Sequence, residues 1–323
     1  MSDAPFKISI TSEFAGSRLD QALAQLCPDW SRARLQRWIK SGAVTVDGER
    51  WRPRDRLKGG EDVRVVVEST DEVEAFVPEP VDLQVVHEDD DLLVLDKPPG
   101  LVVHPAPGHW GGTVLNGLLF RYPELREVPR AGIVHRLDKD TSGLMVVART
   151  LEAHHRLVEA LQRRAFGREY VALVAGQVVA GGRIEAPIGR HRLDRKRMAV
   201  MESGKHAVTH YRLRRRYRAH SLLDVKLETG RTHQIRVHLA HIRYPIVGDP
   251  VYGGRPRLAK GLGADAAEAL MRFRRQALHA ARLTLDHPIS GETLTWERPV
   301  PGDFANLLAV LEKDVLQASG FPE

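Results

Sequence analysis

The stretch GIVHRLDKDTSGLMVVAR, residues 132–149, decides how the rest of the chain is organised. Its apolar runs at 133–134 and 144–147 predict two short buried strands. The charged segment between them is expected at a sheet edge or in a loop that the strands hold in place. Asp138 lies among Arg, Lys and His, whose positive charges favour an ionised carboxylate. Asp138 is therefore a candidate nucleophile or base, and the alternative is a charged turn in which it is a structural cap.

The segment HRLDKDTSGL, residues 135–144, resembles the signature of the RluA-type pseudouridine synthases. In that family the Asp of the signature is the catalytic carboxylate, which implies this role for Asp138. The Arg of the signature fills the gap that an extruded base leaves in the RNA, which implies this role for Arg136. The reaction breaks the N1–C1′ bond of uridine and forms a C5–C1′ bond, so it loses no atoms and exchanges no electrons. The resemblance implies no cofactor and no metal, and it leaves open whether Asp138 attacks C1′ or removes a proton at C2′.

Two further segments carry the same resemblance. Residues 168–174 predict a strand that contains Tyr170, which on pattern alone is an ordinary half-buried aromatic residue. The family stacks the corresponding Tyr on the target base. His104 belongs to the segment DKPPGLVVHP, residues 96–105, which lines the cleft in the family. The resemblance therefore makes His104 a candidate substrate contact, whereas a His beside Pro in a rigid loop is commonly structural.

The segment LETGRTHQIRVHL, residues 227–239, predicts a strand that ends at Gly230 and a helix that starts near Thr232. The family pairs the Arg of the QIR triplet with the catalytic Asp and packs the residue before it on the base. By resemblance these roles belong to Arg236 and Ile235. Arg231 lies at the helix entrance and is a further candidate substrate-binding residue.

Metal and sugar chemistry are the alternatives for these residues. His233, His238 and His241 are spaced by five and three residues, which differs from the His pair of zinc-binding helices. Asp138 and Asp140 are a carboxylate pair of the kind that a glycoside hydrolase uses. They lie only two residues apart in basic surroundings, which suit RNA better than a neutral sugar.

Composition and charge narrow the class of protein. The chain has 323 residues with 42% hydrophobic and 28% charged content, which is typical of a globular protein of more than one domain. It has one cysteine, so disulfide frameworks and Cys-based zinc sites are excluded and a reducing cytoplasm is expected. No apolar run reaches the length of a membrane span, so no membrane contact is expected. The net charge of +6 favours an anionic partner.

Residues 1–75 are expected to form a small basic module. Residues 16–67 hold 11 Lys or Arg and 7 Asp or Glu. Leu spacing predicts a first helix that Pro28 ends, and Ser31 is a candidate N-cap for a second helix, residues 32–40. Val44–Val46, an Asp-Gly turn and residues 49–52 predict a hairpin, and residues 63–67 predict a strand. The segment resembles the α-L RNA-binding motif, which implies RNA contacts for Arg32, Arg34, Arg37 and Lys40; a solvated helix face is the alternative.

The remainder is expected to be a larger α+β catalytic domain, residues 83–323, with a mixed, mostly antiparallel sheet flanked by helices. An acidic stretch from residue 68 to about 82 holds six acids, no basic residue and two prolines, which predicts a tether between the domains. Predicted elements are paired strands at 83–87 and 92–95, a helix at 113–120 with Thr113 as cap, a helix at 150–164 with Leu151 and Leu157 inward, and a C-terminal helix, strand pair and helix.

Residues 190–218 carry 11 Lys or Arg against two acids and predict a phosphate contact. Within the family, residues 128–135 and 248–256 most resemble the members that modify 23S large-subunit ribosomal RNA. The implied partner is that RNA or a ribosomal precursor particle, and the protein is expected to be monomeric. Another rRNA or tRNA target, and a non-catalytic ribosome-assembly factor, are the alternatives.

Overall fold

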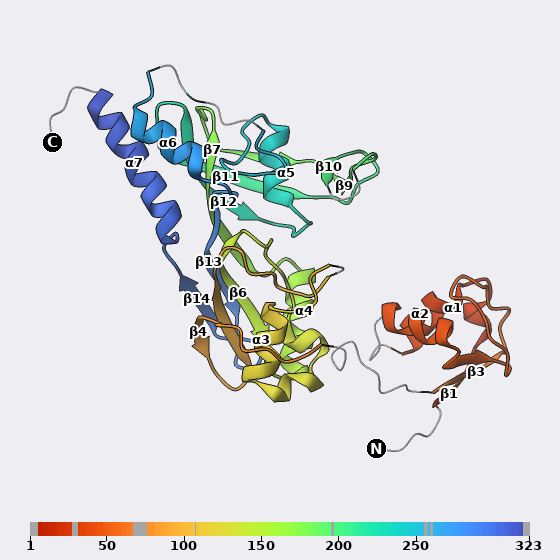
Figure 1. The fold of residues 1–323 in the computed structure, drawn as a ribbon. Helices are drawn as coiled ribbons and strands as arrows, with labels where there is room; N and C mark the ends of the chain where they lie inside the picture. The colour runs from red at the N-terminus through yellow and green to blue at the C-terminus, as the bar shows by residue number, and fades with distance from the viewer. Residues whose placement is uncertain are drawn as a thin grey trace. The chain divides into compact units, whose positions relative to one another are not determined.

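The computed structural model describes residues 6–27, 32–66, 76–106, 108–194, 197–254, 258 and 261–318. The chain forms two compact units, Met1–Ala75 and Phe76–Glu323 (Figure 1). No helix within the described ranges is both long enough and apolar enough to span a lipid bilayer.

The N-terminal unit packs two helices against a three-stranded sheet of order β1-β3-β2. Leu19 and Leu23 of the first helix and Leu35 of the second are fully buried, as the periodicity predicts. Pro28 and Ser31, the predicted stop and cap, lie outside the described residues. The elements are β1 (Phe6–Ser9), η1 (Ser12–Phe14), α1 (Leu19–Leu26), α2 (Arg32–Ser41), β2 (Val44–Val46) and β3 (Asp62–Val65).

The hairpin predicted after Val46 is only partly correct. The turn forms, with φ of 50° at Asp47 and 84° at Gly48, and Val46 and Glu49 exchange hydrogen bonds of 2.9 Å. The chain then leaves the sheet, because the Arg52 N–H donates to the Asp55 carboxylate at 2.7 Å instead of to a strand. The partner of β2 is β3, and β1 also joins β3. Both pairings join segments distant in sequence, which local turn patterns do not predict.

The second unit contains a nine-stranded sheet of order β4-β5-β6-β13-β7-β12-β11-β8, with β14 on β13. Only β13 and β6 pair in parallel, so the predicted mixed, mostly antiparallel sheet is confirmed. A separate two-stranded sheet pairs β9 with β10. The strands are β4 (Val85–Glu88), β5 (Leu92–Lys97), β6 (Ser142–Ala148), β7 (Gly167–Ala175), β8 (Gly182–Glu185), β9 (Ile188–Arg190), β10 (Met198–Val200), β11 (Val208–Arg216), β12 (His220–Leu227), β13 (Leu278–Asp286) and β14 (Thr293–Glu297).

Helices cover the sheet, with α5 and α7 on opposite sides of it (Figure 1). Thr113 caps α3 in a capping box with Asn116, as predicted, and Thr150, expected inside the next helix, is the N-cap of α4. Leu151 is 59% exposed, so its predicted inward position is wrong. It is six residues from buried Leu157, a rotation of about 240° at 3.6 residues per turn. The helices are α3 (Val114–Arg121), η2 (Pro123–Glu127), η3 (Pro129–Gly132), α4 (Leu151–Gln162), α5 (Gln234–His241), α6 (Ala264–Arg272) and α7 (Gly302–Ala318).

Two local predictions differ from the structure. Ile133 forms a single bridge to Val147 where a short strand was expected. Residues 76–82, expected to belong to the tether, are part of the second unit. The Asn116 side chain donates to the carbonyl of Val77 at 2.8 Å, and the Gly112 N–H donates to the Glu79 carboxylate at 2.6 Å. Residues 68–75 of the expected tether lie outside the described residues.

Candidate active site

The side chains of Asp138 and Arg236 meet although they are 98 residues apart in sequence. Arg236 Nη1 donates a hydrogen bond to Asp138 Oδ2 at 2.9 Å. Asp138 lies in the loop before β6, and its side chain is 24% exposed. Arg236 lies in the first turn of α5 and its side chain is 5% exposed. A carboxylate with one side open to solvent and one side on a buried guanidinium is kept negative while it remains accessible to a substrate.

A second carboxylate holds Arg236 in place. Arg236 Nε donates to Asp249 Oδ2 at 2.7 Å, and Nη2 donates to Oδ1 at 2.9 Å. Asp249 Oδ1 also accepts from the N–H groups of Val251 and Tyr252 at 2.9 and 3.0 Å. The guanidinium is therefore fixed on one edge by Asp249, and its remaining Nη1 is directed at Asp138. Sequence interpretation missed Asp249, because it used residues 248–256 only as part of the family resemblance and assigned no role to a single residue there.

This arrangement keeps Arg236 and Asp249 charged. Burial alone lowers the pKa of Arg236, but the hydrogen bonds and charge of Asp249, followed by the charge of Asp138, outweigh it and raise that pKa. Burial alone raises the pKa of Asp249, but the hydrogen bonds and charge of Arg236 bring it below its usual value. Ionised partners in a dry site attract strongly, so the geometry is set before any ligand arrives.

His233 and Tyr252 border the Asp138 carboxylate. His233 precedes α5 in the left-handed conformation, with φ of 56°, and its Nε2 lies 3.9 Å from Asp138 Oδ1. Burial lowers the pKa of His233, although the charge of Asp138 acts against this, so the imidazole is mainly neutral at pH 7. The Tyr252 hydroxyl lies 2.9 Å from His233 Nδ1, and the guanidinium of Arg236 lies over the Tyr252 ring, 5.1 Å from its centroid.

Tyr170 and Ile235 line the apolar side of the same region. They are 7% and 4% exposed, and both belong to one buried cluster that also contains Leu137, the neighbour of Asp138. Burial raises the pKa of Tyr170, so it remains an uncharged phenol, and the charge of Asp138 contributes to this shift. The structure thus brings together Asp138, Arg236, Tyr170 and Ile235, four of the residues singled out from the sequence.

The other three candidate residues of this domain make no direct contact with the Asp138 carboxylate among the described interactions. Arg136 is exposed beside the Asp138 loop, and its charge acts on His233. Arg231 is exposed, and its Nε donates to the carbonyl of His206 at 3.1 Å. His104 packs edge-on against Phe76, with its Nδ1 3.1 Å from the carbonyl oxygen of Pro105. None of the three forms a hydrogen bond or ion pair with Asp138 within the part of the chain that the structure describes.

Two residues that sequence interpretation did not single out, buried Lys97 and partly buried His135, support the Asp138 loop. Lys97 is 2% exposed, and its ammonium group donates to the carbonyls of Pro98, Leu101 and Lys139 at 2.8 to 2.9 Å. It therefore joins the 98–101 loop to the residue after Asp138. His135 Nε2 accepts from the Val146 N–H at 3.0 Å, and burial lowers its pKa to about 3. The His of the signature is a neutral acceptor that anchors β6.

Comparisons with known proteins agree with this geometry. Residues 91–241 match the family model for RNA pseudouridylate synthase. The chain is 55% identical over 303 residues to ribosomal large subunit pseudouridine synthase D of Pseudomonas aeruginosa, covering 94% of each protein. It is 52% identical over 307 residues to the protein of that name from Escherichia coli O157:H7, covering 95% of this chain and 94% of the relative. The chain belongs to the RNA pseudouridylate synthase family. The resemblance seen in residues 135–144 is confirmed.

The catalytic domain of this pseudouridine synthase also resembles a solved human structure. Human RNA Pseudouridylate Synthase Domain Containing 4 aligns with a TM-score of 0.55 and 27% identity, over 71% of this chain and 93% of that one. The enzyme is an isomerase, and the α+β fold expected from the sequence is confirmed.

The N-terminal module of the synthase matches the S4 domain model over residues 17–63, which confirms an RNA-binding S4 module. Arg37 and Lys40 are exposed on α2. Arg32 is half-exposed and donates to the buried carboxylate of Asp20 at 2.8 Å, so only part of its guanidinium is open to a ligand. The side chain of Arg34 lies outside the described residues.

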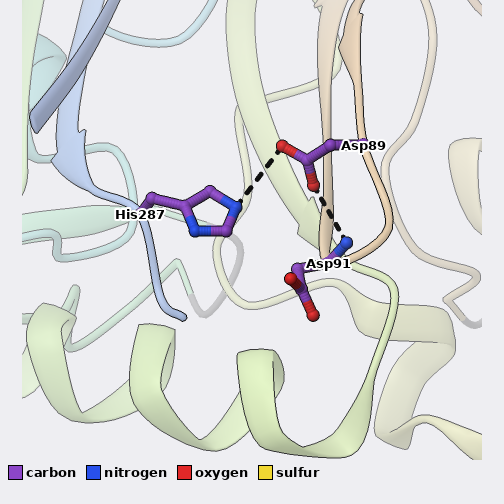
Figure 2. A group of neighbouring side chains, drawn as sticks. All are labelled: Asp89, Asp91 and His287. Carbon is purple, nitrogen blue, oxygen red and sulfur yellow. Dashed lines mark hydrogen bonds and ion pairs between the residues drawn. The ribbon is translucent and has the colours of Figure 1, made fainter. Parts of the chain in front are cut away.

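Asp89, Asp91 and His287 of the synthase form a group in which three metal-ligand atoms lie within 4.8 Å of one another (Figure 2). Their hydrogen bonds account for the arrangement. Asp89 Oδ1 accepts from the N–H groups of Asp91 and Leu92 at 2.9 and 2.8 Å, which closes the turn between β4 and β5. His287 Nδ1 accepts from the Ser290 N–H at 3.1 Å, so its proton lies on Nε2, which faces Asp89 at 3.4 Å. A protonated Nε2 cannot ligate a metal ion.

Proposed function

We propose that this enzyme isomerises uridines of large-subunit ribosomal RNA to pseudouridine, with Asp138 as the catalytic carboxylate. The observation that carries the proposal is the Arg236–Asp138 contact of 2.9 Å at the open side of a buried ion-pair network. The reaction needs a negative group near the ribose of an extruded nucleotide. Attack on C1′ and removal of a proton at C2′ both require this ionised carboxylate.

The surroundings of Asp138 support roles for the other residues. Tyr170 and Ile235 provide an apolar wall against which an extruded base can stack, and base stacking on an aromatic residue is common in RNA recognition. Arg136 is exposed next to Asp138 and is long enough to enter the space that the base leaves in the RNA. Arg231 and His104 are proposed as outer contacts to the substrate.

The choice of ribosomal RNA rests on the relatives and on charge. Both bacterial relatives are named as ribosomal large subunit synthases and match the chain over nearly its whole length. The S4 module and the exposed arginines near β9 and β10 add positive surface for phosphates. Arg32, Arg34, Arg37 and Lys40 are proposed as module contacts, and the large-subunit RNA or its precursor particle as the partner.

The test is to map pseudouridine in large-subunit rRNA from cells that lack this protein, and then to incubate that RNA with the pure enzyme. We expect specific uridines to be unmodified in the mutant cells and to become pseudouridine in vitro. Modification of a different RNA class would refute the proposed target. Binding without any pseudouridine would favour an assembly factor, and release of free base or sugar would favour glycoside hydrolysis.

A further inference from the structure

Arg168 is a buried arginine with no partner. It lies on β7, is 9% exposed, and its Nε is fully buried without a hydrogen bond. Across the described residues no carboxylate lies within ion-pair distance of its guanidinium and no group accepts a hydrogen bond from it. A buried charge without compensation costs several kcal/mol. A protein can tolerate this free-energy cost where a bound ligand compensates the charge.

The position of Arg168 relates it to the active site. It precedes Tyr170 by two residues on the same strand, so both side chains project from the same face of the sheet. The charge of Arg168 acts on both Tyr170 and His135. The unpartnered guanidinium therefore lies beside the proposed base-stacking residue and beside the first residue of the Asp138 signature.

Gly230 provides the space for this guanidinium. A Cβ atom at residue 230 would lie 2.6 Å from Arg168 Nη1, so a larger residue there would displace the end of the arginine side chain. Gly230 is exposed and directly precedes the segment that enters α5. The guanidinium thus lies beside an exposed glycine, and Nε is the nitrogen atom that is fully buried without a partner, which leaves Nη1 and Nη2 open to a ligand.

We propose that Arg168 is a substrate-binding residue whose guanidinium receives an RNA phosphate next to the target nucleotide. This inference rests on the proposed function, because the phosphate belongs to the RNA that the enzyme modifies. A phosphate is the suitable ligand because it carries the missing negative charge and can accept two parallel hydrogen bonds from a guanidinium in a bidentate pair. A neutral base carbonyl would accept a hydrogen bond but would leave the buried charge uncompensated.

The first test replaces the guanidinium by an apolar side chain of similar length. Arg168→Met should weaken binding of an RNA stem-loop that the wild-type enzyme modifies by about tenfold. The slope of log K against log salt concentration should fall by about 0.7 to 0.9. The melting temperature should stay the same or rise, because no partner is left unpaired. Arg272→Met, at an exposed position of α6, is the matched control and should change neither the RNA affinity nor the salt slope.

A purely structural arginine gives the opposite pattern. A lowered melting temperature of Arg168→Met, together with the salt slope of the wild-type enzyme, would overturn the proposal. If Arg168→Met fails to fold, Arg168→Lys replaces it: the proposal predicts weaker RNA binding with the wild-type salt slope retained, and unchanged binding would overturn it. If the wild-type enzyme modified no RNA at all, the proposed function would fail instead, so the two failures are distinguishable.

The second test identifies the phosphate. Neutral methylphosphonate groups, placed singly at the phosphates flanking the target uridine, should weaken binding of the wild-type enzyme at one position by about tenfold. The same substitution should have no further effect on Arg168→Met. Gly230→Ala, which displaces the guanidinium, should weaken wild-type binding and be silent in the Arg168→Met background. Full additivity in both pairs would show that Arg168 does not contact a phosphate.

Discussion

Arg236 and Arg168 are the two arginines classed as buried among the described residues, and their surroundings are opposite. Arg236 donates to two carboxylates through Nε, Nη1 and Nη2. Arg168 donates to none within the same described part of the chain. The difference separates two uses of a buried cation. Around Arg236 the protein itself completes the charge balance and fixes the proposed catalytic carboxylate, whereas around Arg168 we propose that the substrate completes the balance.

The fixed region has a functional consequence. Asp249 occupies two of the donors of Arg236, so the guanidinium cannot rotate away when Asp138 exchanges solvent for substrate. Electrostatic groups that need no reorganisation during the reaction contribute most to catalysis.

The largest effect is expected from Arg236→Met. The substitution leaves the buried carboxylate of Asp249 without its partner, which should lower the free energy of unfolding by about 3 to 5 kcal/mol. Isomerisation should be lost. Urea unfolding of this variant beside Arg168→Met checks the comparison directly. Equal destabilisation by both substitutions would mean that the two arginines do not differ as described.

Asp249→Asn should have the next largest effect. The amide oxygen can still accept from the N–H groups of Val251 and Tyr252, but the charged bonds to Arg236 are lost, at a cost of about 1.5 to 3 kcal/mol. Because Arg236 then holds Asp138 less firmly, kcat should fall more than the affinity for RNA. Steady-state kinetics with RNA above and below KM separates the two quantities. A change confined to KM would contradict a positioning role.

Lys97 extends the comparison to a buried cation that can lose its proton. Burial lowers its pKa to about 7, against the raising effect of Asp140 and Asp138. Between pH 7 and 10 the unfolded chain therefore binds more protons than the folded protein, so stability rises with pH in that window. The free energy of unfolding of the wild-type protein, measured relative to that of Lys97→Met, should rise by up to about 1.4 kcal/mol per pH unit. Urea unfolding at pH 6, 8 and 9 checks this; a constant difference would show that the three carbonyls keep the ammonium group charged.

The smallest effect is expected from Lys40→Gln on the exposed face of α2. An exposed cation contributes mainly through a phosphate contact, so RNA binding should weaken by about 1 kcal/mol or less, with a lower salt slope. The melting temperature should not change. Titration of the full-length protein with RNA at several salt concentrations gives both quantities. An unchanged salt slope would remove Lys40 from the RNA-binding surface.

The sequence predicted what its local patterns contain. The contiguous signature at 135–144, the cap Thr113 and the periodic helices were all recognisable, because each depends on neighbours in the chain. The partnership of Arg236 with Asp138 spans 98 residues, and only the family resemblance indicated it. Asp249 and Arg168 were missed for a related reason. Whether a buried arginine has a carboxylate partner depends on tertiary packing, which local sequence patterns do not contain.

The most direct test of the account compares Asp138→Asn with Asp140→Asn in the pure full-length enzyme. Both substitutions remove one negative charge from the same loop, and only the first removes the carboxylate that Arg236 contacts. Pseudouridine formed in a single turnover with bound RNA is the quantity to measure. The account predicts no product from Asp138→Asn, with RNA binding retained, and product from Asp140→Asn. Product from Asp138→Asn, with an inactive Asp140→Asn, would contradict it.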